Sequence, residues 1–363
     1  MSQPSANRPD GRPFSEPGIP PASEPTRRIL IVQTSHLGDT ILSTPLIGAL
    51  HQLHPGAELW MLTTPAGAEV VRRDPRLQAV IVFDKRARDE GFTGLLRMSQ
   101  RLRRLAFDRV YALQRSFRTS LMLGLSGIRH RIGFTSAKWS FFYHVRRPRN
   151  ADHHDVLRNL ALLSAEAPLA SLPTRIVLFP PGIDAIAPEL AGHVKHPTPY
   201  VLLAPGSAWE TKQWHWEHFR RVAGSLVDQG YRVLLIGAGA DQDINRRVAR
   251  GLAVDDLTNH TSVAEAMALV QHAAGVVCND SMALHLASAF QKPCVAVFCA
   301  TSPAFGFGPW QNPRARVVEQ EDLACRPCSR HGGRRCPTGT RACMEALTPD
   351  RVLSALKTVL PAL

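Results

Sequence analysis

Short apolar runs alternate with helical stretches along most of this chain, and the alternation occurs in two separate series. The first series has apolar runs at 29–33, 58–62, 79–83, 109–113 and 175–179, and the second has runs at 200–205, 231–237, 275–280 and 294–298. Strands that alternate with helices form parallel sheets covered by helices. The sequence therefore predicts an α/β protein with two Rossmann-like domains that face each other across a cleft.

Changes in composition suggest where the domains begin and end. Residues 1–26 are rich in Pro, Ser and Gly with almost no apolar side chains, so we expect a disordered tail. The first domain is expected over 27–180 and a proline-rich linker over 181–199. The second domain, which carries a cysteine cluster, is expected over 200–345, and a C-terminal helix over 346–363.

The net charge of the chain is +13, which favours an anionic partner such as nucleic acid, an acidic membrane surface or a phosphorylated substrate. Neither a secretory signal nor an apolar stretch of about 18 residues is recognisable, so we expect a cytoplasmic location. A helix around residues 91–107 is expected to bury one side and to present four arginines on the other: Leu95, Leu96, Leu102 and Leu105 are buried, and Arg97, Arg101, Arg103 and Arg104 are exposed. That basic side is either an ordinary solvated face or a surface that lies against an anionic membrane.

Three loops follow predicted strands and precede predicted helices: "TSHLGDT", "PGSAWETKQW" and "NDSMALH". Ligands of open α/β sheets bind at the carboxyl ends of strands, so the three loops are expected to converge on one cleft. In the first loop, Asp39 follows Gly38 at the start of a helix. Its carboxylate either caps the helix or faces the cleft and handles a proton.

The second and third loops have residues suited to a phosphorylated ligand. The backbone of Gly206, Ser207 and Ala208 can approach a phosphate closely, and Lys212 adds a positive charge; a turn with a solvated lysine is the alternative. In the third loop Asp280 and Ser281 begin a helix. His285 lies one turn further on, where it either contacts sugar and phosphate oxygens or is a satisfied helix residue. Gln242 occupies the last position of "GAGADQ", which argues against a dinucleotide site.

Four cysteines lie close together near the C-terminus: Cys325, Cys328, Cys336 and Cys343. Four thiolates that open with C-x-x-C suit a tetrahedral structural site for zinc or iron. Reduced thiols or a redox-labile pair are the alternatives, because the spacing is not that of a double C-x-x-C ribbon.

Five segments together carry a resemblance to a known family. They are "RILIVQTSHLGDTILSTPLIGALHQLHPGAELWMLT", "LQRSFRTSLMLGLSGIRHRIGF", "DVLRNLALL", "LAPGSAWETKQWHWEHF" and "VCNDSMALHLASAFQKPCVAVFCATSP". From about residue 27 to 355 the chain resembles the ADP-heptose:lipopolysaccharide heptosyltransferases of glycosyltransferase family nine, and the four-cysteine segment resembles heptosyltransferase II-like members. The resemblance implies a GT-B fold and an inverting transfer of L-glycero-D-manno-heptose from ADP-heptose to the lipopolysaccharide inner core, with no cofactor required for transfer.

The resemblance also implies roles for individual residues. Asp39 matches the general base, and Lys212 matches a catalytic lysine beside the donor phosphates. Donor binding is implied for Gly38, Ser207, Ala208, Lys212, Asp241, Asp280, Ser281, Met282 and His285. Acceptor binding is expected of Arg115, Arg118 and Arg131, which lie where the family holds its acceptor. Met282, where the family usually has Gly, and Ser281, in place of Thr, depart from the family pattern.

Two rival interpretations remain at this point. Within the same class, the chain could heptosylate a protein or use another nucleotide sugar. From another class, it could be a non-catalytic basic protein that binds nucleic acid, although no aromatic-interleaved binding module is recognisable and no nucleic-acid partner is expected. The expected partners are ADP-heptose, a lipopolysaccharide core acceptor and the anionic inner face of the inner membrane, where the enzyme would be peripheral.

Overall fold

The computed structural model describes residues 27–360, so the predicted disordered tail at 1–26 lies outside the described part of the chain. The first sheet contains β1 (Arg28–Gln33), β2 (Glu58–Thr63), β3 (Ala79–Val82), β4 (Arg109–Ala112), β5 (His130–Phe134) and β6 (Val145–Arg147). The second contains β7 (Tyr200–Ala204), β8 (Arg232–Leu235), β9 (Asp255–Asp256), β10 (Gly275–Asn279), β11 (Cys294–Phe298) and β12 (Ala315–Glu319). These two sheets confirm the predicted α/β fold.

Both sheets have the same topology. Their strand orders are β3-β2-β1-β4-β5-β6 and β12-β11-β10-β7-β8-β9, so each sheet grows outward in both directions from its first strand. All the paired strands are parallel, as in the register Leu30↔Trp60 between β1 and β2 and Val277↔Leu203 between β10 and β7. In this doubly wound order, successive strands are added first on one side of β1 and then, from β4 on, on the other side. The same change occurs between β7 and β10, and each change opens a crevice at the carboxyl ends of the two strands.

The connecting helices cover both faces of each sheet. In the first domain they are α1 (Leu37–Leu53), α2 (Pro65–Val71), α3 (Gly91–Leu105), α4 (Phe117–Leu125) and α5 (Asp155–Leu160). The later helices are α6 (Pro188–Lys195), α7 (Trp216–Asp228), α8 (Gln242–Ala249), α9 (Val263–His272), α10 (Met282–Ala289), α11 (Ala342–Glu345) and α12 (Pro349–Lys357). The start of α9 follows a local signal, since Oγ of Ser262 accepts from the backbone N–H of Glu265.

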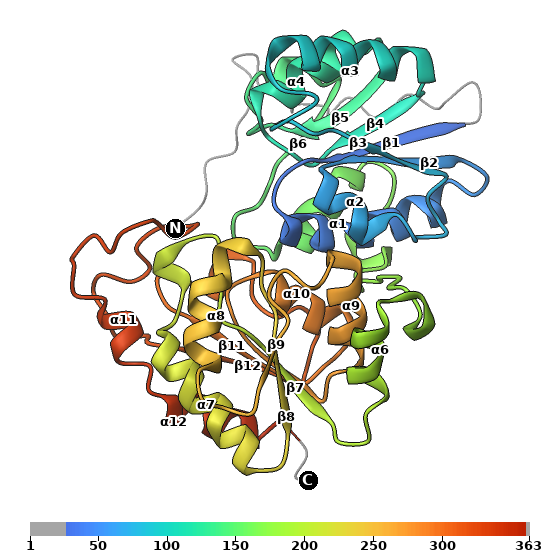
Figure 1. Cartoon of the computed structure of the whole chain (residues 1–363). Helices are drawn as coiled ribbons and strands as arrows, with labels where there is room; N and C mark the ends of the chain where they lie inside the picture. Colours follow the sequence, from blue (N-terminus) through green and yellow to red (C-terminus); the bar gives the residue numbers. More distant parts are fainter. Residues whose placement is uncertain (1–26, 361–363) are drawn as a thin grey trace.

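One apolar core runs through both domains. Side chains of α1, α2 and α5 pack together with those of α9, α10 and α6 in a single buried cluster between the two sheets. Figure 1 shows this arrangement, with α1 and α2 on the side of the first sheet that faces α9 and α10. The outer faces have separate cores, which lie under α3 and α4 in the first domain and under α7 and α12 in the second.

A carboxylate of the first domain also caps a helix of the second. Glu69 of α2 accepts hydrogen bonds from the backbone N–H groups of Val263, at 2.8 Å, and Ala264, at 3.4 Å. Both N–H groups belong to the first turn of α9, which has no intrahelical partners for them. The two domains are therefore joined by these hydrogen bonds as well as by the shared apolar core.

The apolar run at 175–179 is not a strand in the structure, although the sequence predicted one. Ile176 and Leu178 are buried, but the segment is an extended connection between the domains. The carbonyl of Thr174 accepts from Trp310 Nε1 at 2.8 Å, so the chain is already attached to the second domain there. The short strands β5 and β6 form the edge of the first sheet instead. No helix in residues 27–360 is both long and apolar enough to cross a bilayer.

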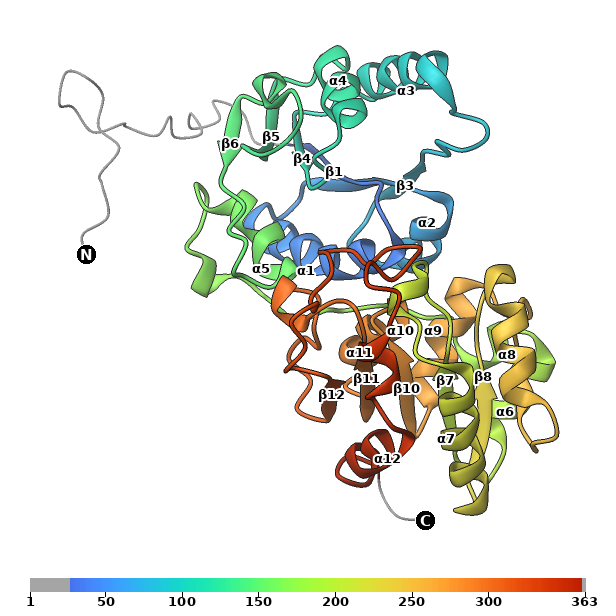
Figure 2. The same ribbon diagram turned by 90° about the vertical axis from the view of Figure 1, so that its left-hand side faces the viewer.

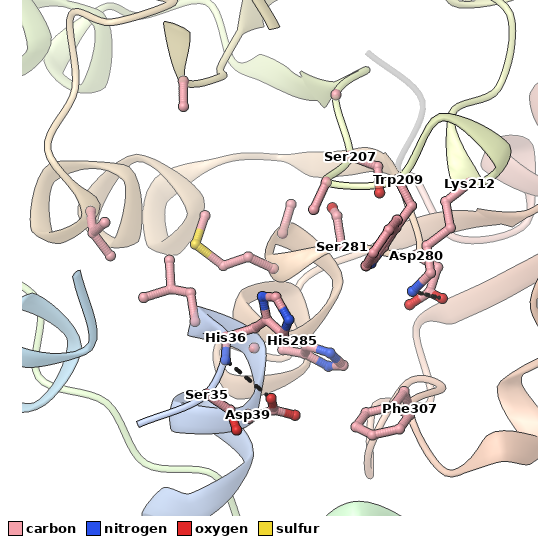
Figure 3. A pocket seen from close by; sticks show the side chains of 18 of the residues that line it. Ser35, His36, Asp39, Ser207, Trp209, Lys212, Asp280, Ser281, His285 and Phe307 are labelled. Carbon is pink, nitrogen blue, oxygen red and sulfur yellow. Dashed lines mark hydrogen bonds and ion pairs between the residues drawn. The ribbon is translucent and has the colours of Figure 1, made fainter. Parts of the chain in front are cut away.

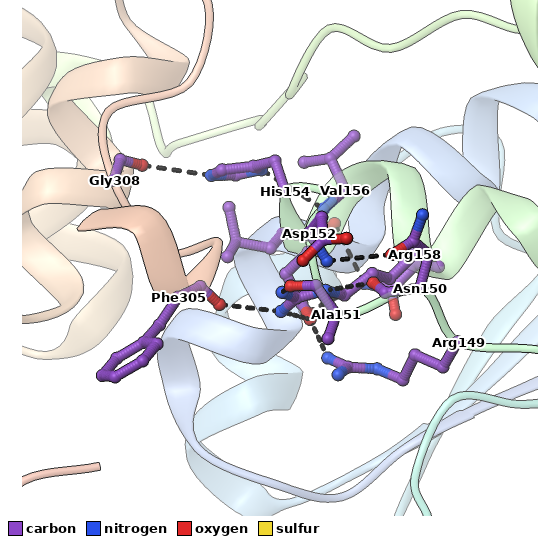
Figure 4. A network of polar contacts seen from close by, with 12 residues as sticks. Arg149, Asn150, Ala151, Asp152, His154, Val156, Arg158, Phe305 and Gly308 are labelled. Carbon is purple, nitrogen blue, oxygen red and sulfur yellow. Dashed lines mark hydrogen bonds and ion pairs between the residues drawn. The ribbon is translucent and has the colours of Figure 1, made fainter. Parts of the chain in front are cut away.

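Arg158 of α5 is fully buried and joins the two domains (Figure 4). Its guanidinium donates to the carbonyl of Phe305 at 2.9 Å, in the second domain, and to the carbonyls of Asn150, at 3.0 Å, and Ala151. Its ion-pair partner is Asp155, one helical turn earlier, at 3.6 Å. A buried guanidinium with these partners fixes the segment that leads into α5 against the second domain.

We predict that Arg158→Met lowers the free energy of unfolding by about 3 kcal/mol, because the change leaves several buried carbonyls without a donor. Urea denaturation followed by circular dichroism measures the effect. The matched control is Arg97→Met on α3, where the arginine is 62% exposed and the expected change is within about 0.5 kcal/mol. Equal stability of the two variants would contradict a structural role for Arg158.

Candidate active site

A cavity of about 1010 Å³ lies between the two domains. Its walls come from the segments that follow the four central strands β1, β4, β7 and β10, and from the starts of α1 and α10. These are the crevices that the doubly wound topology opens in each sheet. The two sheets therefore contribute their ligand-binding edges to one shared space.

Asp39 lies at the start of α1 on the first-domain side of this cavity (Figure 3). Its Oδ2 accepts a hydrogen bond from the backbone N–H of His36 at 3.2 Å, so the carboxylate does satisfy one of the free donors of the helix start. The same side chain lines the cavity. The two interpretations offered by the sequence are thus compatible in one residue.

Burial raises the pKa of Asp39 from its usual 3.8 to about 6, and the nearby carboxylate of Asp155 adds to the rise. The hydrogen bond from His36 and the positive charges of Arg149 and Lys212 act in the opposite direction. A carboxylate with a pKa near 6 is ionised at neutral pH but binds a proton more readily than an ordinary aspartate. That property suits a general base.

Gly38 allows the two domains to approach each other beside Asp39. A Cβ atom at this position would lie 2.9 Å from Cδ2 of His285, a side chain of α10 in the second domain. Real Cβ atoms do not approach other atoms so closely, so only glycine lets the start of α1 pack directly on α10. The short contact brings Asp39 to the face of the second domain.

Lys212 lies on the second-domain side, where it is held by Asp280. The Nζ of Lys212 lies 2.6 Å from Oδ2 of Asp280, and that oxygen also accepts from Thr301 Oγ1 at 2.7 Å. Asp280 is buried at the end of β10, so the ion pair is shielded from water. The arrangement fixes a lysine ammonium at the edge of the cavity.

Gly206 allows Asp241 to pack directly on the backbone of the loop after β7. A Cβ atom at position 206 would lie 2.0 Å from Oδ1 of Asp241. Asp241 Oδ2 accepts from the N–H of Ala238 at 2.9 Å, and burial raises the pKa of this carboxyl. The contact joins the loops after β7 and β8 into one wall of the cavity.

Two buried polar atoms at the start of α10 have no hydrogen-bond partner among residues 27–360. They are Oγ of Ser281 and Nδ1 of His285. Ser281 is the N-cap residue of α10, yet its hydroxyl makes no capping bond. Burial lowers the pKa of His285 to about 4, so its imidazole is neutral. Leaving such groups unpaired is costly, and both residues line the cavity, where a ligand could satisfy them.

The cavity brings together most of the residues that the resemblance implied. Its lining includes Gly38, Asp39, Arg115, Ser207, Ala208, Lys212, Asp241, Asp280, Ser281, Met282 and His285. Arg118 and Arg131 are not part of it. The guanidinium of Arg118 donates to the carbonyls of Asp89 and Gly91, and that of Arg131 donates to the carbonyls of Phe142, at 2.6 Å, and Ile128. Both arginines are therefore engaged in holding loops of the first domain.

Several other residues also line the cavity, although the sequence analysis gave them no role. They are His36, Gln114, Arg149, Asp155, Asn159, Trp209, Phe307, Arg330 and His331. Asp155 and Asn159 belong to the segment "DVLRNLALL", whose likeness to the family was the one available signal. Arg330 and His331 lie between two cysteines of the cluster, and no sequence pattern indicated that this segment reaches the cavity.

The four clustered cysteines were predicted either to hold a metal ion or to be reduced thiols or a redox-labile pair. No group of three or more His, Cys, Asp or Glu side chains in the described part of the chain is placed to hold a metal ion. Cys328 Sγ contacts the carbonyl of Cys325 at 3.1 Å, and Cys336 Sγ lies 3.4 Å from Thr338 Oγ1. Cys343 packs in the core, where burial and then the neighbouring thiols raise its pKa to about 11. The thiols therefore lie near one another, but they do not form a group of three or more metal ligands in the described residues.

A cavity between two Rossmann-like domains, with an acidic group on one side and a lysine and a helix start on the other, suits a phosphorylated ligand in one domain and a second substrate in the other. Comparison with known proteins agrees: the family model for glycosyltransferase family 9 (heptosyltransferase) matches residues 95–336. This chain belongs to that family and is a glycosyltransferase.

Individual relatives support the same conclusion. The chain is 24% identical to lipopolysaccharide heptosyltransferase 2 of Escherichia coli K12 over 92% of this chain and 98% of the relative. It is 27% identical to lipopolysaccharide heptosyltransferase 1 of Pseudomonas aeruginosa, again over 92% and 98%. Among solved structures, ADP-heptose lipopolysaccharide heptosyltransferase II of E. coli superposes with a TM-score of 0.74 at 23% identity, over 92% of this chain and 98% of that one. The likeness confirms the GT-B type of fold.

The raised pKa of Asp39 predicts a pH-dependent stability. Because the folded-state pKa of about 6 exceeds the usual 3.8, the folded protein binds this proton more tightly than the unfolded chain does. The stability that this proton contributes is fully present when the pH is below the pKa of Asp39 in the unfolded chain. It is lost as the pH rises through about 6. Asp39→Asn cannot ionise, so we expect its melting temperature to exceed that of the wild type above pH 6 and the difference to shrink at lower pH.

Thermal unfolding of both proteins across this pH range measures the difference. Asp84→Asn is the control, because Asp84 lies on a loop of the first domain and does not line the cavity. A constant difference between wild type and Asp39→Asn at every pH would contradict the raised pKa.

Proposed function

We propose that this protein is an inverting heptosyltransferase that moves L-glycero-D-manno-heptose from ADP-heptose to the inner core of lipopolysaccharide. The observation that carries the proposal is that Asp39 of the first domain and Lys212 of the second line the same cavity. The names of the relatives, lipopolysaccharide heptosyltransferases 2 and 1, support the choice of donor and acceptor. The four-cysteine segment favours a heptosyltransferase II-like member.

In the proposed reaction Asp39 takes the proton from an acceptor hydroxyl. The hydroxyl oxygen forms a bond to the anomeric carbon of the heptose while the bond from that carbon to the diphosphate breaks, and ADP leaves. A single displacement of this kind inverts the anomeric configuration. A positioned general base contributes roughly 10²–10⁴-fold to such a transfer, because a neutral sugar hydroxyl is a weak nucleophile.

The departing diphosphate gains negative charge, and groups of the second domain are suited to stabilise it. Lys212 supplies an ammonium group, and the start of α10 supplies backbone N–H groups and the positive end of the helix dipole. The unpartnered atoms of Ser281 and His285 are available for sugar or phosphate oxygens. Asp241 is assigned to the ribose side of the nucleotide. The proposal includes no cofactor for the transfer step.

A related enzyme that heptosylates a protein, or that uses another nucleotide sugar, is the second candidate. The same cavity and the same base would serve either reaction, so the identity of the substrates distinguishes the candidates. We favour the lipopolysaccharide acceptor because both relatives are named lipopolysaccharide heptosyltransferases. Binding of nucleic acid without catalysis is not proposed for a chain of this glycosyltransferase family.

We predict that the wild-type enzyme releases ADP from ADP-heptose only when a core oligosaccharide acceptor is present, and that UDP- and GDP-sugars are poor donors.

Asp39→Asn should lower kcat by at least about 10²-fold, since an amide cannot accept the proton. For the wild type, kcat/KM should rise with pH through about 6, where Asp39 ionises. Coupled detection of the released nucleotide measures all three.

The Asn substitution separates catalysis from helix capping. Its amide oxygen can still accept from the N–H of His36, so a purely capping role predicts near-wild-type turnover in Asp39→Asn and a loss only in Asp39→Ala. Calorimetry with ADP provides the control, because both variants should keep the donor site. Turnover of Asp39→Asn close to that of the wild type would remove Asp39 from the role of base.

We also propose that the protein is cytoplasmic and peripheral on an anionic membrane, and that exposed aromatic side chains of the first domain form part of the contact surface. The apolar side of α3 is buried in the first domain through Leu95, Met98 and Leu102. Exposed aromatic side chains lie nearby: Phe92, Phe117, Trp139 and Phe141, which are between 39% and 66% exposed. We call these four residues the aromatic patch.

Three members of the aromatic patch, Phe117, Trp139 and Phe141, lie together near the cavity. The rings of Phe117 and Trp139 lie 4.2 Å apart, and those of Trp139 and Phe141 5.9 Å apart. The backbone N–H of Lys138 donates to the carbonyl of Arg115, a residue that lines the cavity. Aromatic rings beside basic side chains suit the interface of an anionic bilayer. An acceptor embedded in that bilayer would then lie close to the cleft.

We predict that the double variant Trp139→Ser with Phe141→Ser binds vesicles containing phosphatidylglycerol about tenfold more weakly than the wild type, because the two rings no longer enter the interface. Vesicle sedimentation measures the binding, with neutral phosphatidylcholine vesicles as the second arm. Arg221→Ser on α7, which is exposed in the second domain, is the control and should bind as the wild type does. Undiminished binding of the double variant would exclude the aromatic patch as the contact.

A further inference from the structure

The segment between Cys328 and Cys336 belongs to the second domain but reaches the cavity. In Figure 2 the red chain between β12 and α11 extends up to α1 of the first domain. Arg330 and His331, near its tip, line the cavity together with residues of both domains. We call residues 328–336 the cysteine loop.

Backbone hydrogen bonds fix the cysteine loop beside Lys212. The N–H of Gly333 donates to Thr211 Oγ1 at 2.7 Å, and the N–H of Thr211 donates to the carbonyl of Gly333 at 3.1 Å. At its start, the N–H of Cys328 donates to the carbonyl of Ala300 at 2.9 Å. Gly332 has a φ of +79°, and a Cβ atom there would lie 3.0 Å from the side chain of Lys212. The tip of the loop is therefore held against the turn that carries the lysine.

Positive charge gathers where the tip of the loop faces the first domain. Arg330, Arg115 and Arg149 line the same cavity. Burial lowers the pKa of Arg149 and of Arg158, and the positive charges of Arg330 and Arg115 lower both further. The carboxylate among them is that of Asp155, which is already paired with Arg149 and Arg158. Of the four guanidinium groups gathered here, only those of Arg149 and Arg158 pair with this carboxylate.

Two of these guanidinium groups have no partner of their own. Within residues 27–360, neither Arg330 nor Arg115 makes a side-chain hydrogen bond or an ion pair, and Arg330 lies over the ring of Phe305 at 6.0 Å. Both residues are half-buried and line the cavity. Like charges that converge in a partly shielded space are unfavourable unless an anion joins them. Guanidinium groups bind phosphate and carboxylate with paired hydrogen bonds.

We propose that Arg330 of the cysteine loop and Arg115 of the first domain form an anion-binding subsite for a phosphate or carboxylate group of the acceptor. This subsite rests on the proposed function for the identity of the acceptor. The donor diphosphate is assigned to Lys212 and the start of α10, whereas Arg330 lines the cavity together with Arg149 and Asp155, the charges of the first domain that also act on Asp39. An anion held there belongs to the molecule whose hydroxyl Asp39 deprotonates.

Steady-state kinetics of Arg330→Ala and Arg115→Ala test the subsite. With the native phosphorylated acceptor, each variant should raise the acceptor KM about tenfold, as expected for the loss of one charged hydrogen-bond pair, while the KM for ADP-heptose changes less than about twofold. Arg334→Ala is the matched control, because Arg334 is in the same loop but lines a separate pocket beside His215. It should behave as the wild type.

The chemistry of the acceptor identifies the anion. If the group is a phosphate, phosphatase-treated acceptor should give wild type and Arg330→Ala the same KM. If it is a carboxylate, the difference should survive phosphatase and vanish when the carboxyl group of the acceptor is reduced. A difference that persists after both treatments, or an acceptor KM of Arg330→Ala equal to that of the wild type, overturns the subsite.

A binding measurement separates this proposal from the proposed function. With ADP saturating the donor site, about 10 mM inorganic phosphate should raise the melting temperature of the wild type and of Arg334→Ala, but not that of Arg330→Ala or Arg115→Ala. A wild type that responds to phosphate but never turns over ADP-heptose would refute the proposed function and leave the subsite intact. An equal phosphate response in wild type and Arg330→Ala, or none in the wild type, would refute the subsite.

Discussion

The close approach of α1 to α10 at Gly38 is the contact on which the arrangement of the cavity depends. The Cα of residue 38 lies so near His285 that a single added carbon would be 2.9 Å from the imidazole. Around this contact, the helices between the two sheets share one apolar core, which holds the ligand-binding edges of the sheets toward each other. A bulkier residue at 38 would push the domains apart at the point where Asp39 and Lys212 share one cavity.

Asp39 shows how one position can serve structure and chemistry together. Its hydrogen bond from His36 stabilises the start of α1 and favours the ionised carboxylate, while burial and Asp155 favour the protonated form. The second pair of effects is the larger, so the pKa rises to about 6. A fully solvated capping aspartate would stay ionised at pH 6 and below, down to its usual pKa, but it would be a weaker base. Placing the cap at the wall of the cavity gives the side chain a property that capping alone does not need.

The sequence predicted the fold and the convergence of three loops because both depend on local patterns. Alternation of apolar runs with helical spacing requires parallel sheets, and parallel sheets bring strand ends to one edge. The run at 175–179 shows the limit of that reasoning, since β-like residues form a strand only where a neighbouring strand has a free edge. Arg118 and Arg131 show another: clustering along the chain does not reveal which guanidinium groups bind carbonyls of their own loops. Arg330 reaches the cavity through tertiary contacts of the cysteine loop with Thr211, which no local pattern encodes.

The ion pair between Lys212 and Asp280 constrains how the second domain would receive a diphosphate. Asp280 already balances the charge of the lysine at 2.6 Å, so the ammonium alone cannot neutralise an incoming nucleotide sugar. The bond from Thr301 holds Asp280 in place, which favours a lysine that turns from the carboxylate toward the ligand over a carboxylate that moves away. The remaining stabilisation must then come from neutral donors at the start of α10. In the proposed reaction, the bound donor would satisfy the buried hydroxyl of Ser281, which caps nothing, and Nδ1 of His285, which lacks a partner in the described chain.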